Sequence, residues 1–155
     1  MNAADKVAVY YRFAAEERPD RDLFDQIIHD DIQVSDPPIG AGLVGKVAAW
    51  EALNVSPELK QGPGTMNLKS WYVGYFGDEN EGYGRWNWCM GGAVAPWYGL
   101  PLADDPPEDN PILVEVIAHI KFKDGKIIEV CEAWDAVPVL RRFGLDLPVP
   151  KPPVS

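Results

Sequence analysis

The sequence predicts an α+β domain, with helices in the first third of the chain and a sheet in the remainder. Two observations lead to this fold class. Up to residue 53, apolar residues recur every three or four positions, which is typical of helices that bury one face. From residue 67 onward, apolar and polar residues alternate between turn-forming residues, which is typical of strands. Helices followed by an antiparallel sheet form an α+β layout.

Three helices are expected in the first third of the chain. The first begins near Asp5, a residue type that caps helix starts, and ends before Arg18 and Pro19. The second is short and begins near Asp20, and the third follows a loop over 40–45. Their apolar stripes are Val7, Tyr10, Tyr11 and Ala14 in the first, Leu23, Phe24, Ile27 and Ile28 in the second, and Val47, Trp50 and Leu53 in the third.

The strands are expected over 32–35, 67–76, 82–90, 112–122 and 126–134. The last two are joined by Asp124 and Gly125, a pair that supplies the positive backbone angles of a tight hairpin. The segment 93–111 is rich in proline and acids and is predicted to be a long loop insertion, and 147–155 is a Pro-rich extended tail. With 155 residues, the whole chain 1–155 is expected to form a single domain.

The composition of the chain argues against several classes of binding partner. The chain has 24 Asp and Glu against 14 Lys and Arg, a net charge of −10 that repels nucleic acids and anionic membranes. Its apolar runs are too short to span a bilayer and no signal peptide is visible, so a cytoplasmic location is expected. The two cysteines and two histidines show no metal-binding spacing, and no glycine motif of a nucleotide site is present. We therefore expect neither a metal nor an organic cofactor.

Two motifs resemble a known superfamily. Residues 30–40, DDIQVSDPPIG, followed by Gly45 and Lys46, resemble a strand and loop of ketosteroid isomerase. Residues 122–129, FKDGKIIE, with Trp134-Asp135 and 139–144, resemble the closing hairpin and C-terminal helix of SnoaL-like polyketide cyclases. Both families belong to the nuclear-transport-factor-2-like superfamily. The resemblance implies a cone-shaped fold with three N-terminal helices packed on a curved, mostly antiparallel mixed sheet.

Strand parity singles out one acid. The even positions of 112–122 are all apolar, whereas the odd positions include Glu115 and His119. On the next strand the even positions are Ile128, Val130 and Trp134, with Glu132 as the single acid among them. A carboxyl group on an apolar face is costly unless it is paired or protonated, and such groups serve well in acid–base catalysis. Glu132 is therefore a catalytic candidate; the alternative is a structural ion pair with Arg85.

The resemblance adds further candidates. Glu132 stands where SnoaL-like cyclases and limonene epoxide hydrolases have a catalytic Asp. Asp36 matches the proton-shuttling base of ketosteroid isomerase, although an Asp before two prolines is also an ordinary turn former. The protonated Asp of that isomerase falls on Ala118, and its Tyr maps onto Tyr10 or Tyr11.

A third motif concerns the strand 82–90. Arg85-Trp86-Asn87 resembles the R-x-D motif of limonene epoxide hydrolases, with Asn87 replacing the second acid. Arg85, if it points inward, would stabilise a developing oxyanion, and Asn87 would orient a water molecule or a carbonyl group.

The leading hypothesis is a cofactor-free acid–base enzyme of the SnoaL-like cyclase type, acting on an apolar small molecule that carries a carbonyl group. The enolate would cyclise, isomerise or lose water. The alternatives are a non-catalytic binding protein or dimeric scaffold, and a limonene-type epoxide hydrolase. His119 is expected on the polar face and would join the pocket only if the strand register shifted by one residue. The expected substrate-binding residues are Tyr10, Tyr11, Trp50, Ala118, His119, Trp134, Trp97 and Tyr98.

The opposite face of the sheet is expected to bind a second copy of the chain. It would carry Ile117, Cys131 and one of Trp86 and Trp88, and an exposed apolar patch usually marks an interface. Relatives in the superfamily commonly pair sheet to sheet, so a two-fold homodimer is predicted. The loop 93–111 would then lie at the mouth of the cone, where Trp97 and Tyr98 would cover the ligand.

Overall fold

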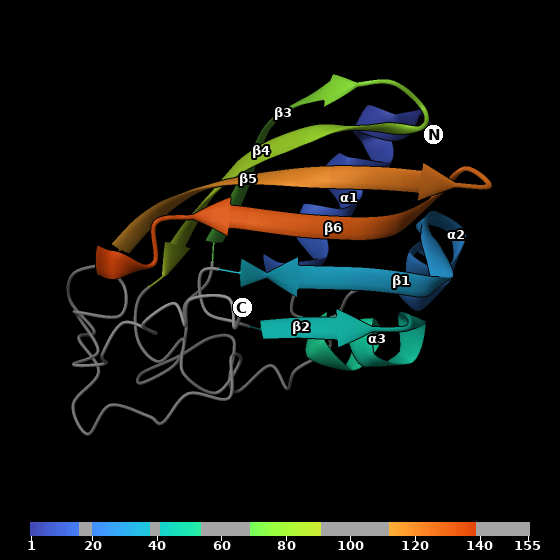
Figure 1. Cartoon of the computed structure of the whole chain (residues 1–155), viewed down its shortest axis with the longest axis horizontal. Coiled ribbons are helices and arrows are strands. Elements are labelled where there is room, and N and C mark those ends of the chain that lie inside the picture. Colours follow the sequence, from blue (N-terminus) through green and yellow to red (C-terminus); the bar gives the residue numbers. More distant parts are fainter. Residues whose placement is uncertain (16–19, 38–40, 54–68, 91–111, 139–155) are drawn as a thin grey trace, which may run out of the picture.

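A computed structural model of the chain describes residues 1–15, 20–37, 41–53, 69–90 and 112–138, which contain three helices and a six-stranded mixed sheet (Figure 1). This arrangement confirms the α+β class. Along the sheet the strands follow the order β2-β1-β6-β5-β4-β3. The elements are α1 (Ala3–Ala15), α2 (Arg21–Ile27), β1 (Ile28–Asp36), β2 (Ala41–Val44), α3 (Lys46–Leu53), β3 (Lys69–Gly77), β4 (Glu81–Met90), β5 (Ile112–Lys123) and β6 (Lys126–Trp134).

The helices begin close to where the sequence places them, but they do not form one N-terminal block. Asp20 caps α2, since its side chain accepts the backbone N–H of Leu23 at 3.1 Å. The helix ends one residue earlier than expected, because Ile28 already has extended backbone angles and begins β1. The strands β1 and β2 then separate α2 from α3.

The strand β2 corrects the expected loop over 40–45. Its residues pair with the end of β1 in antiparallel register, from Gln33 opposite Val44 to Asp36 opposite Ala41. A four-residue edge strand that contains glycine has weak strand propensity of its own. Its pairing with β1, rather than its local sequence, makes it a strand.

The hairpin between β5 and β6 confirms the predicted turn, but the strand pairing beside the turn differs by one residue from the expected register. Asp124 and Gly125 both have positive φ angles, 51° and 71°. Beyond the turn, Phe122 pairs with Ile127 but Lys121 pairs with Glu129, so an irregularity leaves Ile128 outside the regular register. Ile127 is therefore fully buried on the inner face, where Ile128 had been expected.

The core lies between α1 and one face of the sheet, here called the inner face. Tyr11 of α1 stacks on Trp86 of β4, with ring centroids 3.4 Å apart. Gly84 makes room for this contact, since a Cβ atom there would lie 2.9 Å from Ile120 Cδ1 and 3.2 Å from Tyr11 Cε2. Both Trp86 and Trp88 are buried in this core, so the expectation that one of them lies on the opposite face is wrong.

Several expectations fall on residues outside the described ranges. They concern the loop 93–111 with Trp97 and Tyr98, the C-terminal helix over 139–144 and the tail 147–155. Among the described helices, none is long and apolar enough to cross a bilayer.

Candidate active site

Two acidic side chains lie next to each other on the inner face, at one end of the sheet. The strands β1 and β6 are parallel neighbours and end side by side (Figure 1). Val34 pairs with Val130 and Ser35 with Cys131, so the next step of the register brings Asp36 beside Glu132. Asp36 and Glu132 are only 5% and 6% exposed. This acid pair is the only buried charged or polar pair in the part of the chain that the structure describes.

Apolar and aromatic residues surround the acid pair. Ala118 of β5 is fully buried and lies directly opposite Glu132 in the β5–β6 register. The indole Nε1 of Trp134 donates a hydrogen bond of 2.8 Å to Asp36 Oδ1. Tyr10 and Tyr11 approach from α1 and are also buried. Of the described Lys, Arg and His side chains, none forms an ion pair with Glu132.

Burial determines the protonation of this site. Burial, and after it the negative charge of Asp36, raises the pKa of Glu132 to about 8. Burial also raises the pKa of Tyr10 and of Tyr11 well above the usual range, with Glu132 as the next cause. At neutral pH Glu132 therefore holds a proton, and both tyrosines stay neutral donors.

The two acids consequently have different roles. The N–H of Trp134 favours the charged form of Asp36, because a donor stabilises a carboxylate. Glu132 thus holds a proton beside a second buried carboxyl group that accepts an N–H donor. A site built in this way can accept a proton from a ligand and donate a hydrogen bond to it at the same time.

Two further polar atoms are buried beside the site. The Tyr11 hydroxyl and the Trp86 Nε1 have no hydrogen-bond partner among the described residues. Buried polar groups are nearly always hydrogen-bonded, and leaving one without a partner costs roughly 1–3 kcal/mol. A polar atom of a bound molecule would satisfy them.

Arg85 and Asn87 do not belong to this site. Trp86 and Trp88 are buried on the inner face, so the alternation of β4 places Arg85 and Asn87 on the opposite, outer face. There Arg85 Nη2 forms an ion pair of 2.9 Å with Glu115 Oε1. The alternative in which Arg85 forms a structural ion pair with Glu132 is therefore wrong, and Arg85 and Asn87 do not lie beside the acid pair as the catalytic roles expected of them would require.

His119 also lies on the outer face, as strand parity predicts. Its Nε2 is 3.4 Å from Glu81 Oε2, and its ring is 5.1 Å from that of Tyr83. The register is not shifted, because Ala118 rather than His119 faces the acid pair. His119 is thus not a substrate-binding residue of the inner face.

Trp50 lies among residues of α2. Its ring centroid is 5.1 Å from that of Phe24, and the guanidinium carbon of Arg21 lies 4.8 Å from it. Its described aromatic and cation contacts thus join it to α2 rather than to the acid pair. The candidate site that remains comprises Asp36, Glu132, Tyr10, Tyr11, Ala118 and Trp134.

Trp86 and Trp88 form an aromatic wall on the inner face and are not among the substrate-binding residues expected from the sequence. Tyr11 stacks on Trp86, and the Trp86 and Trp88 centroids are 6.3 Å apart. The signal that could have located them is the even parity that they share with Gly82 and Gly84. The described residues contain no group of three or more His, Cys, Asp or Glu side chains arranged to hold a metal ion.

A family model described as SnoaL-like domain matches residues 7–130, and the chain therefore belongs to this family. Asp36 and both tyrosines lie inside the matched residues, and Glu132 and Trp134 lie just beyond them. No curated protein matches the sequence.

Solved structures share the fold. TsrD from Streptomyces laurentii has 13% identity and a TM-score of 0.63 over 90% of this chain and 92% of its own. A hypothetical protein with a ketosteroid isomerase-like fold from Catenulispora acidiphila, in complex with trimethylamine, has 14% identity and a TM-score of 0.63 over 92% and 94%. TerC, co-crystallised with polyporic acid, has 12% identity and a TM-score of 0.60 over 89% and 94%. At these identities the likeness shows the fold alone.

Proposed function

We propose that this protein is an acid–base enzyme of the SnoaL-like cyclase type, acting on an apolar small molecule that carries a carbonyl group. The observation that supports this proposal is the buried acid pair, in which Glu132 has a pKa of about 8 beside the charged Asp36. Catalytic acids and bases work best when their pKa lies near the operating pH. A pair held in two different protonation states provides a base and an acid in one place.

The proposed step is a proton abstraction. The Asp36 carboxylate takes a proton from the carbon next to the carbonyl group, and the electron pair of that C–H bond moves toward the carbonyl oxygen. Protonated Glu132, with Tyr10 as a second donor, stabilises the negative charge that develops on this oxygen. The resulting enolate then closes a ring, isomerises or loses water. The aromatic wall accommodates an apolar substrate.

The relatives support a pocket for small organic molecules. TerC was crystallised with polyporic acid and the Catenulispora protein with trimethylamine. A non-catalytic binding protein is the second candidate, favoured by the buried Tyr11 hydroxyl, which a ligand could satisfy without any reaction. Epoxide hydrolysis of the limonene type is disfavoured, because Arg85 and Asn87 lie on the outer face.

The proposal is tested by proton exchange, which requires no knowledge of the final product. Apolar ketones are incubated with the protein in deuterated water, and NMR measures the loss of the signal of the proton next to the carbonyl. We expect Asp36→Asn and Glu132→Gln each to slow this exchange by about 10²–10⁴-fold. Asp31→Asn, which removes an exposed acid from the same strand β1, is the matched control and should exchange at the rate of the unchanged protein.

Three results would contradict proton abstraction. Ligand binding without exchange would assign the protein to the binding class. Incorporation of labelled oxygen from water into a diol would assign it to the hydrolases. Equal exchange by Asp36→Asn and by Asp31→Asn would show that the acid pair does not carry the reaction.

We further propose that the outer face of the sheet joins two copies of the chain. Its large apolar side chains are 46–70% exposed: Trp71, Phe76, Tyr83, Leu113 and Ile117. The face also carries charges of both signs, in the Arg85–Glu115 and Lys121–Glu129 pairs, so a second copy turned by a two-fold axis meets complementary charges.

Light scattering measures this association directly. We expect the mass of a dimer for the unchanged protein and the mass of one chain for Ile117→Asp. Val47→Asp, which introduces the same charge at an exposed apolar residue of α3, should leave the dimer intact. A single-chain mass for the unchanged protein would contradict the dimer.

A further inference from the structure

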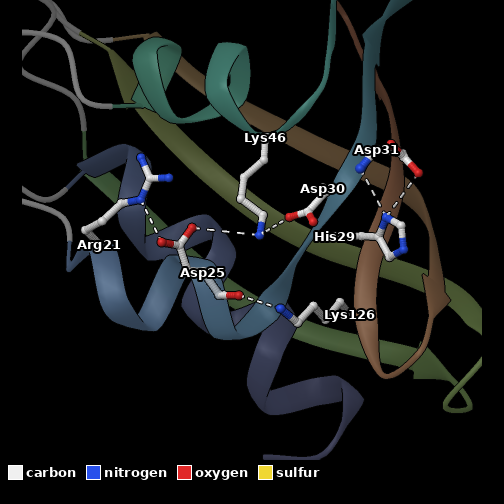
Figure 2. A network of polar contacts seen from close by, with 7 residues as sticks. All are labelled: Arg21, Asp25, His29, Asp30, Asp31, Lys46 and Lys126. Carbon is white, nitrogen blue, oxygen red and sulfur yellow. Dashed lines mark hydrogen bonds and ion pairs between the residues drawn. The ribbon is translucent and has the colours of Figure 1, made fainter.

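A second polar site lies at the opposite end of β1 and β6 from the acid pair. Arg21, Asp25, Asp30, Lys46 and Lys126 meet there around a surface pocket of about 700 Å³ (Figure 2). We call it the cationic pocket. Lys126 is the first residue of β6 and Asp30 is near the start of β1, whereas Asp36 and Trp134 end the same strands. The two sites are therefore separated by the length of these strands.

The cations of the pocket are gathered around Asp25 of α2. Arg21 Nε donates to Asp25 Oδ2 at 2.9 Å, and Lys46 Nζ is 3.8 Å from Asp25 Oδ1. Lys46 also pairs with Asp30. Lys126 Nζ donates instead to the backbone carbonyl of Asp25 at 2.7 Å. Side chains from α2, α3 and β6 thus converge on Asp25.

The pocket has a surplus of positive charge. The hydrogen bond from Arg21 lowers the pKa of Asp25, and the one from Lys46 lowers the pKa of Asp30, so both carboxylates are ionised at neutral pH. Three cations then face two anions. Lys126 carries the surplus charge, because its nitrogen bonds to a neutral carbonyl and forms no ion pair with a described carboxylate. In a chain with a net charge of −10, this is a local reversal of sign.

Arg21 is held with its terminal nitrogens available. Its guanidinium carbon lies 4.8 Å from the ring centroid of Trp50 and 5.8 Å from that of Phe24, which restrains the plane of the group. Only Nε engages Asp25, and the two terminal nitrogens point away from that carboxylate (Figure 2). A planar fork of this kind matches the oxygens of a phosphate group.

The start of α3 adds to the positive potential of the pocket. Residues from Gly45 to Ala48 line the pocket. The Gly45 carbonyl accepts the N–H of Ala49 at 3.1 Å, a hydrogen bond at the start of α3. A glycine in this position has no side chain to accept the amide protons of the first turn. The helix start therefore supports the charge of the side chains.

We propose that the cationic pocket binds an oxyanion of the phosphate type. The terminal nitrogens of Arg21 contact its oxygens as a fork, and Lys126 contributes a point charge from the opposite side. Lys46, held between Asp25 and Asp30, contributes to the field without being free to move. This proposal is independent of the reaction at the acid pair. The group bound is either free phosphate or a phosphate carried by a larger small molecule.

The experiment is an NMR titration of the isotope-labelled protein with inorganic phosphate and, separately, with glycerol 3-phosphate, at constant ionic strength. We expect saturable shifts at the Arg21 Nε, at Lys126 and at the amides from Gly45 to Ala48. Tighter binding of glycerol 3-phosphate assigns the pocket to a carried phosphate group, and tighter binding of inorganic phosphate assigns it to the free ion. Either order supports the proposal.

Variants show whether the residues of the cationic pocket bind the phosphate. Lys126→Gln and Arg21→Gln should each weaken phosphate binding about tenfold, the effect of one charge-assisted contact. Lys126→Arg retains the charge and should keep the affinity. Arg12→Gln removes the same charge from the exposed last turn of α1, outside the residues that line the pocket, and should also keep it.

Three outcomes would overturn the proposal. One is the absence of saturable shifts with both phosphates. Another is a set of shifts spread over the whole surface. The third is an equal loss of affinity in Arg12→Gln and Lys126→Gln, which would show a response to net charge alone.

Discussion

Carboxyl groups at the two ends of β1 and β6 lie in opposite environments, and their pKa values change in opposite directions. At one end Asp36 and Glu132 are buried among aromatic side chains, and the pKa of Glu132 rises to about 8. At the other end Asp30 is exposed and Asp25 is partly exposed, cations surround both, and the pKa of each is lowered. Carboxyl groups at the two ends of this pair of strands thus serve as a proton donor at one end and as permanent charges at the other.

The difference comes from solvation. A buried carboxyl group loses its hydration, so the neutral form is favoured unless a cation compensates for the loss. At the exposed end, water remains and hydrogen bonds from Arg21 and Lys46 stabilise the charged form. Burial, more than residue type, therefore decides which acids of this protein can exchange protons near neutral pH.

Glu132→Gln should remove most of the dependence of stability on pH above pH 5. In the folded protein the pKa of Glu132 is about 8, against an ordinary value of 4.5. Its stabilising contribution is complete below the ordinary value and is lost as the pH rises through 8, at about 1.4 kcal/mol for each pH unit. Chemical denaturation across this pH range measures the slope. A slope as steep in Glu132→Gln as in the unchanged protein would contradict the assignment.

Gly84→Ala should lower the free energy of unfolding by about 1–3 kcal/mol, because the added methyl group meets Ile120 and the ring of Tyr11. Gly74→Ala on the neighbouring strand is the control, since a Cβ atom there would lie 3.6 Å from Phe76, an ordinary contact. Denaturant titrations of both variants measure the difference. Equal stabilities would show that α1 does not lie tightly on β4.

Asp36→Asn should lower the pKa of Glu132 without returning it to 4.5. The charge of Asp36 is the second cause of the raised value, and burial, the largest cause, remains. The asparagine side-chain oxygen can still accept the N–H of Trp134, so the packing is kept. Carbon-13 NMR of the Glu132 carboxyl carbon follows its titration. An unchanged midpoint would show that the two acids do not interact.

Asp30→Asn should have the smallest effect on stability. Asp30 is exposed, and water and salt screen its pair with Lys46. We expect its small effect to appear at neutral pH and low salt and to vanish toward acidic pH, because the lowered pKa of Asp30 stabilises the fold above its ordinary value and loses this effect as the pH falls. Thermal unfolding at two salt concentrations measures it. A loss as large as that of Gly84→Ala would mean that the exposed network holds the fold together.

Local patterns in the sequence predict much of the fold. The helical spacing around Val7 and Tyr11 predicts α1, and Asp124-Gly125 predicts the β5–β6 hairpin with its positive φ angles. Both signals involve residues close in sequence, so they need no knowledge of the rest of the chain. The strand β2 gives no such signal, because its pairing with β1 defines it.

Some residues of the candidate site are predictable from the sequence, and others are located only by the folded structure. Glu132 is recognisable from the sequence as an acid on an apolar strand face, and the structure buries it there. The motif resemblance predicts an inward Arg85, whereas the parity of its own strand points it outward, and the structure agrees with the parity. The cationic pocket has no sequence motif, because its cations come from α2, α3 and β6.

By itself, the sequence determined the elements with strong local periodicity, the tight turn between the last two strands, and the presence of one acid on an apolar face. Only the tertiary structure decided which groups meet. It set Asp36 beside Glu132 through the parallel pairing of β1 and β6, and it brought Trp134 to Asp36 from 98 residues away. The physical reason is range: helix and turn preferences act between neighbours along the chain. Desolvation and the field of a nearby charge depend on distance in space, and therefore act only in the folded protein.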